Sequence, residues 1–397
     1  MLLNRAEGCL NVAFAIALAV PHGTSEIPRF KGDAVTSPDS MRDSEADHAR
    51  LPASGAIATM PILLLHVHEH CNCRCLMCDI WQRTDGKELD IADFARHRES
   101  LVRLGIREAV LTGGEALLHR GFDGLCTFLR EYGARVTLLT TGLLLARRAD
   151  AVANGVDEAI VSIDGPEEVH GQVRRVKGAH QLVGKGIEAV RQLRPQMPVH
   201  ARSTIQKANH RVLRQTVADA KAIGLNSVSF LATDLTSQAF NRDVVWPIMR
   251  QNEVALSRSE VEALEVEVEA LIRENSEDFR TRYIVESPEK MRRIARRFRE
   301  HLGDCAPVAP MCNAPWVSAV VEVDGTVRPC FFHQSIGSVA GMTLEEVING
   351  DEAQRFRASL DVETDPICRR CVCSLNYKQA ERPWSPTTTI ASSEPAL

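Results

Sequence analysis

The chain has 397 residues, with 47 basic and 52 acidic side chains and a formal net charge of −5. This length is sufficient for two domains with a sizeable hydrophobic core, and the near balance of charge excludes the strongly basic surface expected of a nucleic-acid-binding protein. The cysteines lie mainly in two clusters, which predicts metal ligands in a reducing compartment, the cytoplasm, rather than a disulfide framework.

The first 59 residues carry no pattern of a folded core. Residues 10–20 have the length of a signal-peptide core but are too short to span a bilayer as a helix. Residues 36–55 are polar and rich in Ser, Asp and Ala, so they cannot bury enough surface to order themselves. We predict that residues 1–59 are a disordered or dispensable extension, with alternative starts at Met41 and Met60, and that the protein does not associate with a membrane. Export is the alternative interpretation.

From Pro61 onward, segments typical of strands and helices alternate. We expect strands over residues 62–68, 108–111, 136–139, 158–163, 199–205 and 227–231, and helices over residues 90–104, 122–132, 182–194 and 210–223. Six strands with intervening helices predict right-handed βαβ crossovers and a parallel sheet. We assign this first domain to residues 60–235.

Three cysteines directly follow the first predicted strand. Cys71, Cys75 and Cys78 are spaced C-x-x-x-C-x-x-C, a loop that can place three thiolates on one face of a 4Fe–4S cluster and leave one iron without a protein ligand. Structural zinc is the alternative, but zinc sites usually pair their cysteines in two C-x-x-C knuckles. Cys73 lies within the loop and is a further ligand candidate.

Two other predicted strands end in residues suited to ligand binding. Thr112-Gly113-Gly114-Glu115 follows the second strand, and glycines let the backbone approach a ligand closely. The fourth strand continues into Asp164-Gly165-Pro166, with His170 and Arg174 after it. Each segment alone is a turn found in many α/β proteins. Because active sites of parallel barrels form at the carboxyl ends of the strands, we expect the three loops to meet.

Acid or base candidates are fewer. His66, His68 and His70 alternate along the first strand and therefore share one face, and Asp234 follows the sixth strand. We predict His68 and Asp234 as catalytic residues, with structural hydrogen bonding as the alternative.

The pattern of residues 236–300 predicts a helical connector. One helix carries Val261, Leu264, Val268 and Leu271 at helical spacing, and a second, over residues 290–300, carries five arginines. We expect these charged faces to be solvated or paired with each other; anion binding by the arginines is the alternative.

A second cysteine group occupies residues 301–380, ahead of a tail at 381–397 expected to be disordered. Residues 317–323 and 326–332 predict a β-hairpin with a two-residue turn at Asp324-Gly325, which returns Cys330 toward Cys312. Cys368 and Cys371 form a C-x-x-C pair. Four such cysteines suit a metal centre, and zinc is again the alternative to iron.

These motifs, in this order, resemble the radical S-adenosylmethionine (SAM) superfamily. Cys71-Asn72 begins a C-N-x-x-C-x-x-C core, Gly113-Gly114-Glu115-Ala116 resembles G-G-E-P, and residues 161–174 resemble V-S-x-D-G-P…H-x-x-x-R. Thr140-Thr141-Gly142 stands where the family often has T-N-G. The C-x12-G-x4-C and C-x-x-C order at the C-terminus resembles the SPASM/twitch module in its short form with one auxiliary cluster.

The resemblance implies a partial (β/α)6 TIM-type barrel, then the helical connector, then a small β-hairpin and helix module that holds an auxiliary 4Fe–4S cluster. It implies that Cys71, Cys75 and Cys78 bind the first 4Fe–4S cluster; that Gly113, Gly114, Glu115, Ser162 and Arg174 contact SAM; and that Cys312, Cys330, Cys368 and Cys371 bind the auxiliary cluster. It assigns no role to Cys73, Cys305 or Cys373.

The activity implied is reductive cleavage of SAM to a 5′-deoxyadenosyl radical, which abstracts hydrogen from a small-molecule biosynthetic intermediate. The auxiliary cluster would help to oxidise or rearrange the product, and a flavodoxin- or ferredoxin-type donor would supply electrons. A peptide-modifying maturase is the alternative, although residues 1–59 show no helix–strand pattern of a leader-recognition domain. A non-catalytic iron–sulfur electron carrier is a third hypothesis, and it would need no SAM-binding loops.

Overall fold

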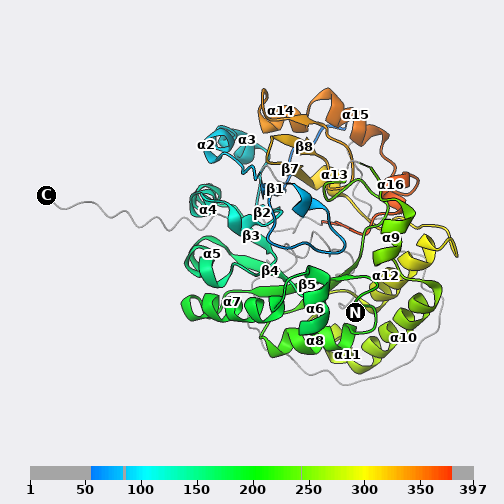
Figure 1. The fold of residues 1–397 in the computed structure, drawn as a ribbon. Helices are drawn as coiled ribbons and strands as arrows, with labels where there is room; N and C mark the ends of the chain where they lie inside the picture. The colour runs from blue at the N-terminus through cyan, green and yellow to red at the C-terminus, as the bar shows by residue number, and fades with distance from the viewer. Residues whose placement is uncertain (1–54, 84–85, 243, 378–397) are drawn as a thin grey trace, which may run out of the picture.

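The computed structural model describes residues 55–83, 86–242 and 244–377 (Figure 1). The strands are β1 (Ile62–His68), β2 (Glu108–Gly113), β3 (Arg135–Thr140), β4 (Glu158–Ser162), β5 (Val199–Ile205), β6 (Val228–Ala232), β7 (Ser318–Val321), β8 (Thr326–Arg328) and β9 (Gly337–Ser338). The helices of the barrel region are α2 (Ile91–Ala95), α3 (Arg98–Arg103), α4 (Phe122–Glu131), α5 (Ala149–Gly155), α6 (Glu167–Arg174), α7 (Ala179–Leu193) and α8 (Leu213–Ala222). Those after it are α9 (Ile248–Val254), α10 (Arg258–Glu274), α11 (Ser276–Arg280), α12 (Pro288–His301), α13 (Ala314–Val317), α14 (Leu344–Ile348), α15 (Asp351–Ser359) and α16 (Pro366–Arg369).

All nine strands belong to one sheet in the order β6-β5-β4-β3-β2-β1-β7-β8-β9. The six predicted strands are confirmed, and each pairs in parallel with its neighbour in sequence, as expected for a partial barrel with helices outside (Figure 1). β7 pairs in parallel with β1, and β8 and β9 continue antiparallel. The C-terminal segment therefore extends the barrel sheet, a pairing that the sequence pattern did not predict.

Alternation along β1 explains why the sheet is buried on both faces. Leu63, Leu65 and Val67 pack in the larger core under the helices, whereas Ile62 and Leu64 pack in a second cluster inside the barrel. Strands of a parallel sheet covered on both sides are apolar in this way. The inner face turns polar toward the carboxyl end of β1, and it is there that a cavity opens.

Two elements differ from the predictions. The helix expected over residues 90–104 is broken into α2 and α3. Arg96, which lies between them, donates to the carbonyl of Val339 (3.0 Å) and so joins the break to the C-terminal module. The hairpin turn uses three residues instead of two. The backbone N–H of Gly325 donates to the carbonyl of Glu322 (2.9 Å), and Gly325 has a φ of 82°, which is the left-handed geometry of a hairpin turn that closes with a bulge.

Residues 55–59, which we assigned to the N-terminal extension, contact the C-terminal module in the structure. Ile57 is buried, and its backbone exchanges hydrogen bonds of 2.9 and 3.0 Å with the side chain of Asn349. The guanidinium of Arg357 donates to the carbonyl of Gly55. We call residues 55–59 the N-terminal latch. The remainder of the predicted extension, residues 1–54, and the predicted tail at 381–397 lie outside the described residues.

The connector helices pair as predicted. Arg292 of α12 contacts Glu269 of α10 (2.6 Å), and Arg299 contacts Glu265 (2.7 Å). Their apolar faces join the main core beside α8 and β6. Within the described parts of the chain, none of the helices is both long and apolar enough to cross a membrane.

Candidate functional site

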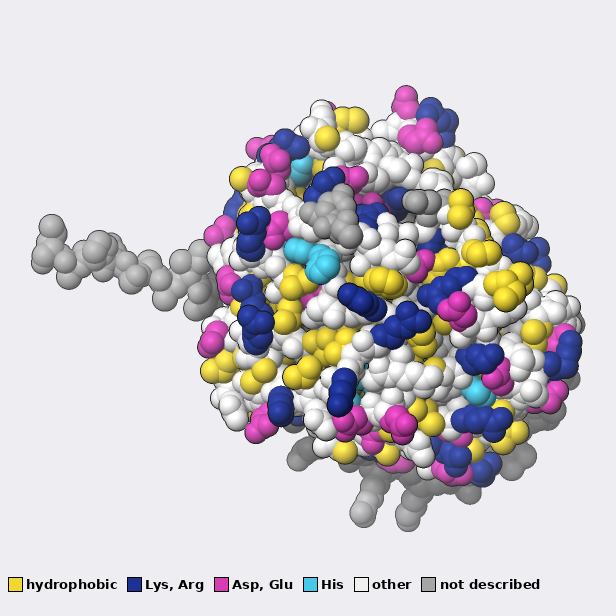
Figure 2. Space-filling view, viewed as in Figure 1, with side chains coloured by type: hydrophobic (Ala, Val, Ile, Leu, Met, Phe, Trp, Pro, Cys, Tyr) yellow, Lys and Arg dark blue, Asp and Glu magenta, His cyan; other side chains and the backbone are white. Residues whose placement is uncertain are grey.

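A cavity of about 400 Å³ opens at the carboxyl ends of the barrel strands. Of the residues predicted from the sequence, it brings together Cys71, Cys75, Cys78, Gly113, Gly114, Ser162, Arg174, His68 and Asp234. The face seen in Figure 2 carries Lys and Arg side chains among hydrophobic atoms over its middle, with Asp and Glu more frequent toward the rim. Residues up to 166 positions apart in the sequence thus meet in one concave site, the arrangement typical of a small-molecule pocket.

Three cysteines of the loop after β1, Cys71, Cys75 and Cys78, line this cavity. The sulfurs of Cys71 and Cys78 accept hydrogen bonds from the backbone N–H groups of Cys73 (3.5 Å) and Ile80 (3.4 Å), and that of Cys75 accepts one from Arg174 Nη1 (3.5 Å). Cys73 itself is buried and does not line the cavity. The geometry therefore separates three candidate ligands from the fourth cysteine, which the spacing alone could not do.

The pKa values of the thiols indicate that the cysteines can ionise together only beside a cation. Burial raises the pKa of Cys71 and raises that of Cys78 to about 12. A hydrogen bond from Cys73, together with the charge of Arg174, lowers the pKa of Cys75 to about 6. Three thiolates packed together are disfavoured without cations, so this donor set fits an iron–sulfur cluster that neutralises them.

Two glycines at the end of β2, Gly113 within the strand and Gly114 directly after it, allow the cysteine loop to approach the strand. A Cβ atom at Gly114 would lie 2.3 Å from the carbonyl oxygen of His70, and one at Gly113 would lie 2.5 Å from that of His68. Instead, the N–H of Gly114 donates to His68 (2.8 Å) and that of Glu115 to His70 (2.9 Å). The glycines are needed for backbone packing as well as for access to the cavity.

Glu115, which the resemblance implies as a SAM contact, is not among the residues that line the cavity. Its carboxylate is buried behind the cavity wall, where Oε1 accepts from Thr140 Oγ1 (2.8 Å) and Leu117 N (3.0 Å), and Oε2 from Thr141 N (2.8 Å). The hydroxyl of Thr141 also lies 3.0 Å from Asn72 Oδ1 in the cysteine loop. Glu115 thus supports the loop through Thr141, a residue to which our sequence analysis assigned no role.

Arg174 lies between the fourth strand and the cysteine loop. Its Nε donates to Asp164 Oδ2 (2.6 Å), while the carbonyls of Arg174 and Val173 accept from the N–H groups of Arg74 and Leu76 (3.3 and 3.0 Å). Burial alone would lower the pKa of Arg174, but the attraction of Asp164 and the cysteine sulfurs raises it. The end of α6 therefore supports the loop and presents a fixed cation to the cavity.

Three residues of the connector, Arg242, Trp246 and Arg250, hold the cysteine loop in a way that the sequence did not predict. We call these three residues the clasp. Arg242 donates to the carbonyl of Met77 (3.2 Å) and Arg250 to that of Leu76 (2.6 Å), while the indole N–H of Trp246 donates to the carboxylate of Asp79. Both guanidiniums stack on the Trp246 ring, at 3.7 and 4.5 Å from its centroid. Single arginines carry no local pattern in the sequence, so their hydrogen-bond partners are known only from the folded structure.

The two predicted acid or base residues both line the cavity. Burial lowers the pKa of His68, and its Nδ1 accepts from the N–H of His70 (3.0 Å). The carboxylate of Asp234 pairs with Arg242 (2.5 Å) and accepts from Ser237 Oγ (2.6 Å). Their catalytic roles remain predictions; the ion pair gives Asp234 a structural task in holding the clasp.

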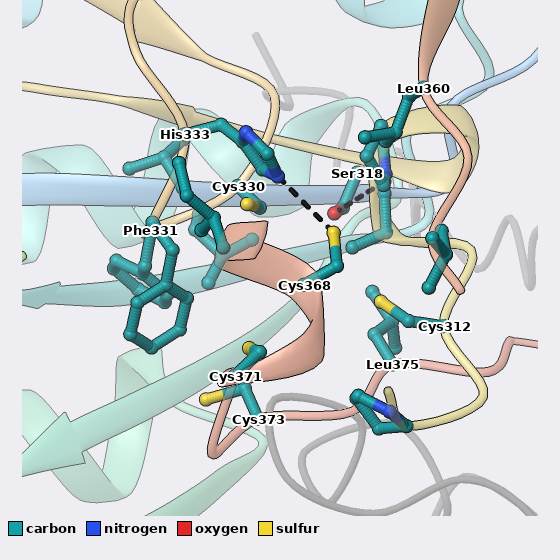
Figure 3. Close-up of a pocket in the computed structure, with 18 residues that line it drawn as sticks. Cys312, Ser318, Cys330, Phe331, His333, Leu360, Cys368, Cys371, Cys373 and Leu375 are labelled. Atoms are coloured by element: carbon teal, nitrogen blue, oxygen red, sulfur yellow. Dashed lines mark hydrogen bonds between the residues drawn. The ribbon is translucent and has the colours of Figure 1, made fainter. Parts of the chain in front are cut away.

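A second, smaller cavity lies beneath β7 and the C-terminal segment (Figure 3). Cys312, Cys330, Cys368, Cys371 and Cys373 all line it, and His333 Nε2 lies 3.3 Å from the sulfur of Cys368. Cys305 is elsewhere, in a surface groove beside α10 and α12. Burial raises the pKa of each of the five thiols. Clustered thiols in an apolar enclosure, with no disulfide among the described cysteines, fit a metal centre.

The two cavities share a wall. Phe331, Phe332 and Cys373 line both, so the second cysteine group lies directly behind the large cavity. β7 makes this possible because it pairs with β1 and brings the C-terminal module against the barrel mouth.

A parallel partial barrel with a cysteine triplet at its mouth, backed by a second cysteine centre, defines a class of iron–sulfur protein. Residues 65–229 match the radical SAM superfamily model, and residues 312–372 match that of SPASM, an iron–sulfur cluster-binding domain. The chain therefore carries a radical SAM domain followed by a SPASM-type module, and the cofactors of these two domains are SAM and 4Fe–4S clusters. This favours iron over the zinc alternative at both cysteine groups.

Relatives of known name are similar over part of the chain. A probable GTP 3′,8-cyclase of Methanocella arvoryzae is 29% identical over 130 residues, covering 32% of this chain and 42% of that protein. The Fe-coproporphyrin III synthase of Methanosarcina barkeri is 26% identical over 156 residues, covering 38% of each. This chain thus matches about two-fifths of the length of these relatives. Streptococcus suis SuiB, solved with its precursor peptide SuiA, has a TM-score of 0.55 and 12% identity, covering 81% of this chain and 73% of that one, and shows the shared fold.

Proposed function

We propose that this protein is a radical SAM enzyme that acts on a small-molecule biosynthetic intermediate with the help of one auxiliary 4Fe–4S cluster. The observation that carries the proposal is the single cavity in which the cysteine triplet, the glycine turn after β2, Ser162 and Arg174 meet, with the second cysteine group behind its wall. A non-catalytic electron carrier would need no cavity of this size beside its cluster.

Each group of residues has a defined task in this proposal. Cys71, Cys75 and Cys78 hold the first cluster, which when bound supplies the electron that splits SAM into methionine and a 5′-deoxyadenosyl radical. The backbone at Gly113 and Gly114 and the side chains of Ser162 and Arg174 hold SAM against it; the latter two are the polar groups at the ends of β4 and α6 that face the cavity.

On the other side of the cavity, Cys312, Cys330, Cys368 and Cys371 hold the auxiliary cluster. Phe331 and Phe332, which line both cavities, lie between this cluster and the large cavity. We infer that the substrate binds between the two centres, with the carbon that loses hydrogen facing SAM. A ferredoxin- or flavodoxin-type donor supplies electrons, and the cytoplasm provides the reducing surroundings that such clusters require.

A small molecule is favoured over a peptide by the dimensions of the cavity and by two relatives. About 400 Å³ lies in the range of pockets that enclose small ligands. The names of the relatives refer to GTP and to Fe-coproporphyrin III, which are both small molecules. Peptide modification is the alternative, and substrate trials with peptides would test it.

The experiment uses full-length protein that is reconstituted anaerobically and incubated with SAM and dithionite. We expect wild-type protein to form 5′-deoxyadenosine, and the variant with Cys71, Cys75 and Cys78 all changed to Ala to form none while retaining about four irons in the auxiliary centre. Cys126→Ala is the matched control, because Cys126 is buried in the core and lines neither cavity. Formation of 5′-deoxyadenosine by the triple variant would show that the radical site is assigned to the wrong residues.

Identification of the substrate follows from isotope transfer. Incubation with deuterated candidate metabolites should place deuterium in 5′-deoxyadenosine only when the correct substrate is present. Transfer from a peptide and from no small molecule would replace the proposal with peptide modification.

A further inference from the structure

One arginine that lines the large cavity lacks the carboxylate partner that the other arginines of the cavity have. Five arginines line this cavity, and four form ion pairs: Arg83 with Glu69, Arg174 with Asp164, Arg242 with Asp234 and Arg328 with Glu322. Among the described residues, no carboxylate oxygen lies within 4.0 Å of the side-chain nitrogens of the fifth, Arg202.

Arg202 lies inside the barrel on β5. The strand register sets it beside Ser162 of β4 and Ser229 of β6, and its Nε donates to the hydroxyl of Ser229 (3.3 Å). Its Nη2 is shielded from solvent and has no hydrogen-bond partner within the described chain. An unmade hydrogen bond at a buried charged group is among the more costly defects in a protein interior. Such a defect persists at functional sites when a ligand corrects it.

The groups around Arg202 do not already satisfy it. The acidic side chain that acts on it, Glu286, accepts from the N–H of Phe230 (2.8 Å) and lies 3.9 Å from Lys290 Nζ. Cys373 also attracts Arg202, but burial outweighs both and lowers the pKa of Arg202. Arg202 lines the large cavity and not the smaller one that the auxiliary cysteines enclose. Because Arg202 lines this cavity without a carboxylate partner, its guanidinium is available to an anion that enters the space assigned to the substrate.

We propose that Arg202 binds an anionic group of the substrate, a carboxylate or a phosphate, and thereby fixes the substrate between the SAM site and the auxiliary centre. This inference rests on the proposed function, since it places the substrate in the same cavity. A guanidinium fork matches both groups, because either oxyanion offers two oxygens to parallel N–H donors. The substrate class is accordingly an organic acid or a phosphate ester.

The test measures anion binding to anaerobically reconstituted full-length protein saturated with SAM. Inorganic phosphate and succinate serve as probes in isothermal titration calorimetry, and their relative affinity distinguishes a phosphate from a carboxylate subsite. We expect Arg202→Met to weaken binding of the preferred probe by tenfold or more, and Arg202→Lys, which keeps the charge but loses the fork, to weaken it less. The control is the double variant Glu322→Gln and Arg328→Gln, which removes a paired cavity arginine without changing net charge and should alter affinity by less than threefold.

A second measurement needs no ligand. If Arg202 has no anionic partner until the substrate binds, Arg202→Met removes an unpaired buried cation and should raise Tm by about 2 °C. If Arg202 instead neutralises the auxiliary centre, Tm should fall and the reduced auxiliary cluster should change its electron-spin spectrum.

Three results would overturn the inference: neither probe binds wild-type protein, both bind the Met variant as well as wild type, or the Met substitution weakens only SAM. Reductive SAM cleavage by the same wild-type preparation tests the proposed function separately. Active cleavage without anion binding refutes the subsite alone, whereas absence of cleavage refutes the proposed function.

Discussion

At the scale of single residues, close backbone contact explains the glycine pair after β2. Glycine is retained at position 114 because three backbone atoms of residues 69 and 70 occupy the space of a side chain, the nearest at 2.3 Å. These residues lead directly into Cys71, so any shift here moves the first candidate ligand of the cluster.

Gly114→Ala should therefore displace the cysteine loop. We expect lower iron content at the first cluster and SAM affinity reduced by about tenfold or more, because misplacement by about 1 Å is enough to disable a positioned site. Iron analysis and equilibrium binding of SAM would measure this. Gly341→Ala is the control, since it is exposed, has ordinary backbone angles and has open space around it. Normal iron content and SAM affinity in Gly114→Ala would contradict this reading of the turn.

The five cysteines of the smaller cavity raise a question of ligand choice. Four were predicted as ligands, and Cys373 lines the same cavity but also the large one. With four ligands each binding one iron of a 4Fe–4S cluster, the fifth thiol is left over.

Cys371→Ala should reduce the iron content from about eight to about four per chain, whereas Cys373→Ala should leave it near eight. Iron analysis and the absorption of reconstituted protein would distinguish the two variants. The reverse pattern would make Cys373 the ligand and free Cys371.

At the scale of elements, the site depends on segments that hold the loops from outside the barrel strands. The clasp at Arg242, Trp246 and Arg250 secures the cysteine loop from the connector. On the opposite side, the N-terminal latch joins the chain ahead of β1 to α14 and α15. Both act through side chains that bond to distant backbone carbonyls, and such contacts have no period or spacing in the sequence.

A chain starting at Met60 should consequently be less stable than one starting at Gly55. The shorter chain loses the burial of Ile57, which is 6% exposed, and leaves Arg357 without the carbonyl of Gly55. We expect a loss of about 2–4 kcal/mol in the free energy of unfolding. Thermal unfolding of both chains would measure it, and Asn349→Ala in the longer chain should reproduce part of the loss. Equal Tm values would restore the view that every residue before Met60 is dispensable.

At the scale of the whole molecule, one sheet carries both centres. β1 lies between β2 and β7, so the loop after β1 and the C-terminal module are held by adjacent strands. A continuous sheet fixes the separation of the two cysteine groups more firmly than two domains joined by a linker would. The shared wall at Phe331 and Cys373 then follows from strand order.

Residues and strands could be predicted from the sequence to different degrees. The Cys71, Cys75 and Cys78 spacing and the alternation of the six strands are local, so they were predictable. The pairing of β7 with β1 joins residues more than 250 positions apart, so it has no local signal. Whether a cavity arginine such as Arg202 has a carboxylate partner is likewise decided by the folded arrangement. Glu115 lies in a motif that the sequence analysis identified, yet its burial behind Thr141 results from packing between distant segments.

The floor of the barrel carries a pair of buried carboxyl groups. Glu108 of β2 accepts from Thr137 Oγ1 (2.7 Å), and Glu158 of β4 pairs with Arg135. Burial, and then the charge of Glu158, raise the pKa of Glu108 well above its usual value. Burial also raises the pKa of Glu158 to about 7, although Arg135 opposes this. The folded state therefore holds these protons more tightly than the unfolded chain.

Because the raised pKa values belong to the folded state, this stabilisation is complete below about pH 4.5, the unfolded value, and is lost as pH rises. Each proton contributes a slope of at most about 1.4 kcal/mol per pH unit. Glu108→Gln keeps an oxygen for Thr137 but cannot ionise, so we expect Tm close to that of wild type at pH 5 and higher than that of wild type at pH 8. Thermal unfolding of the cluster-loaded protein at both pH values would measure the difference. Glu168→Gln, at an exposed position on α6, should show no such divergence; parallel curves for Glu108→Gln and wild type would mean that Glu108 is ionised inside the barrel.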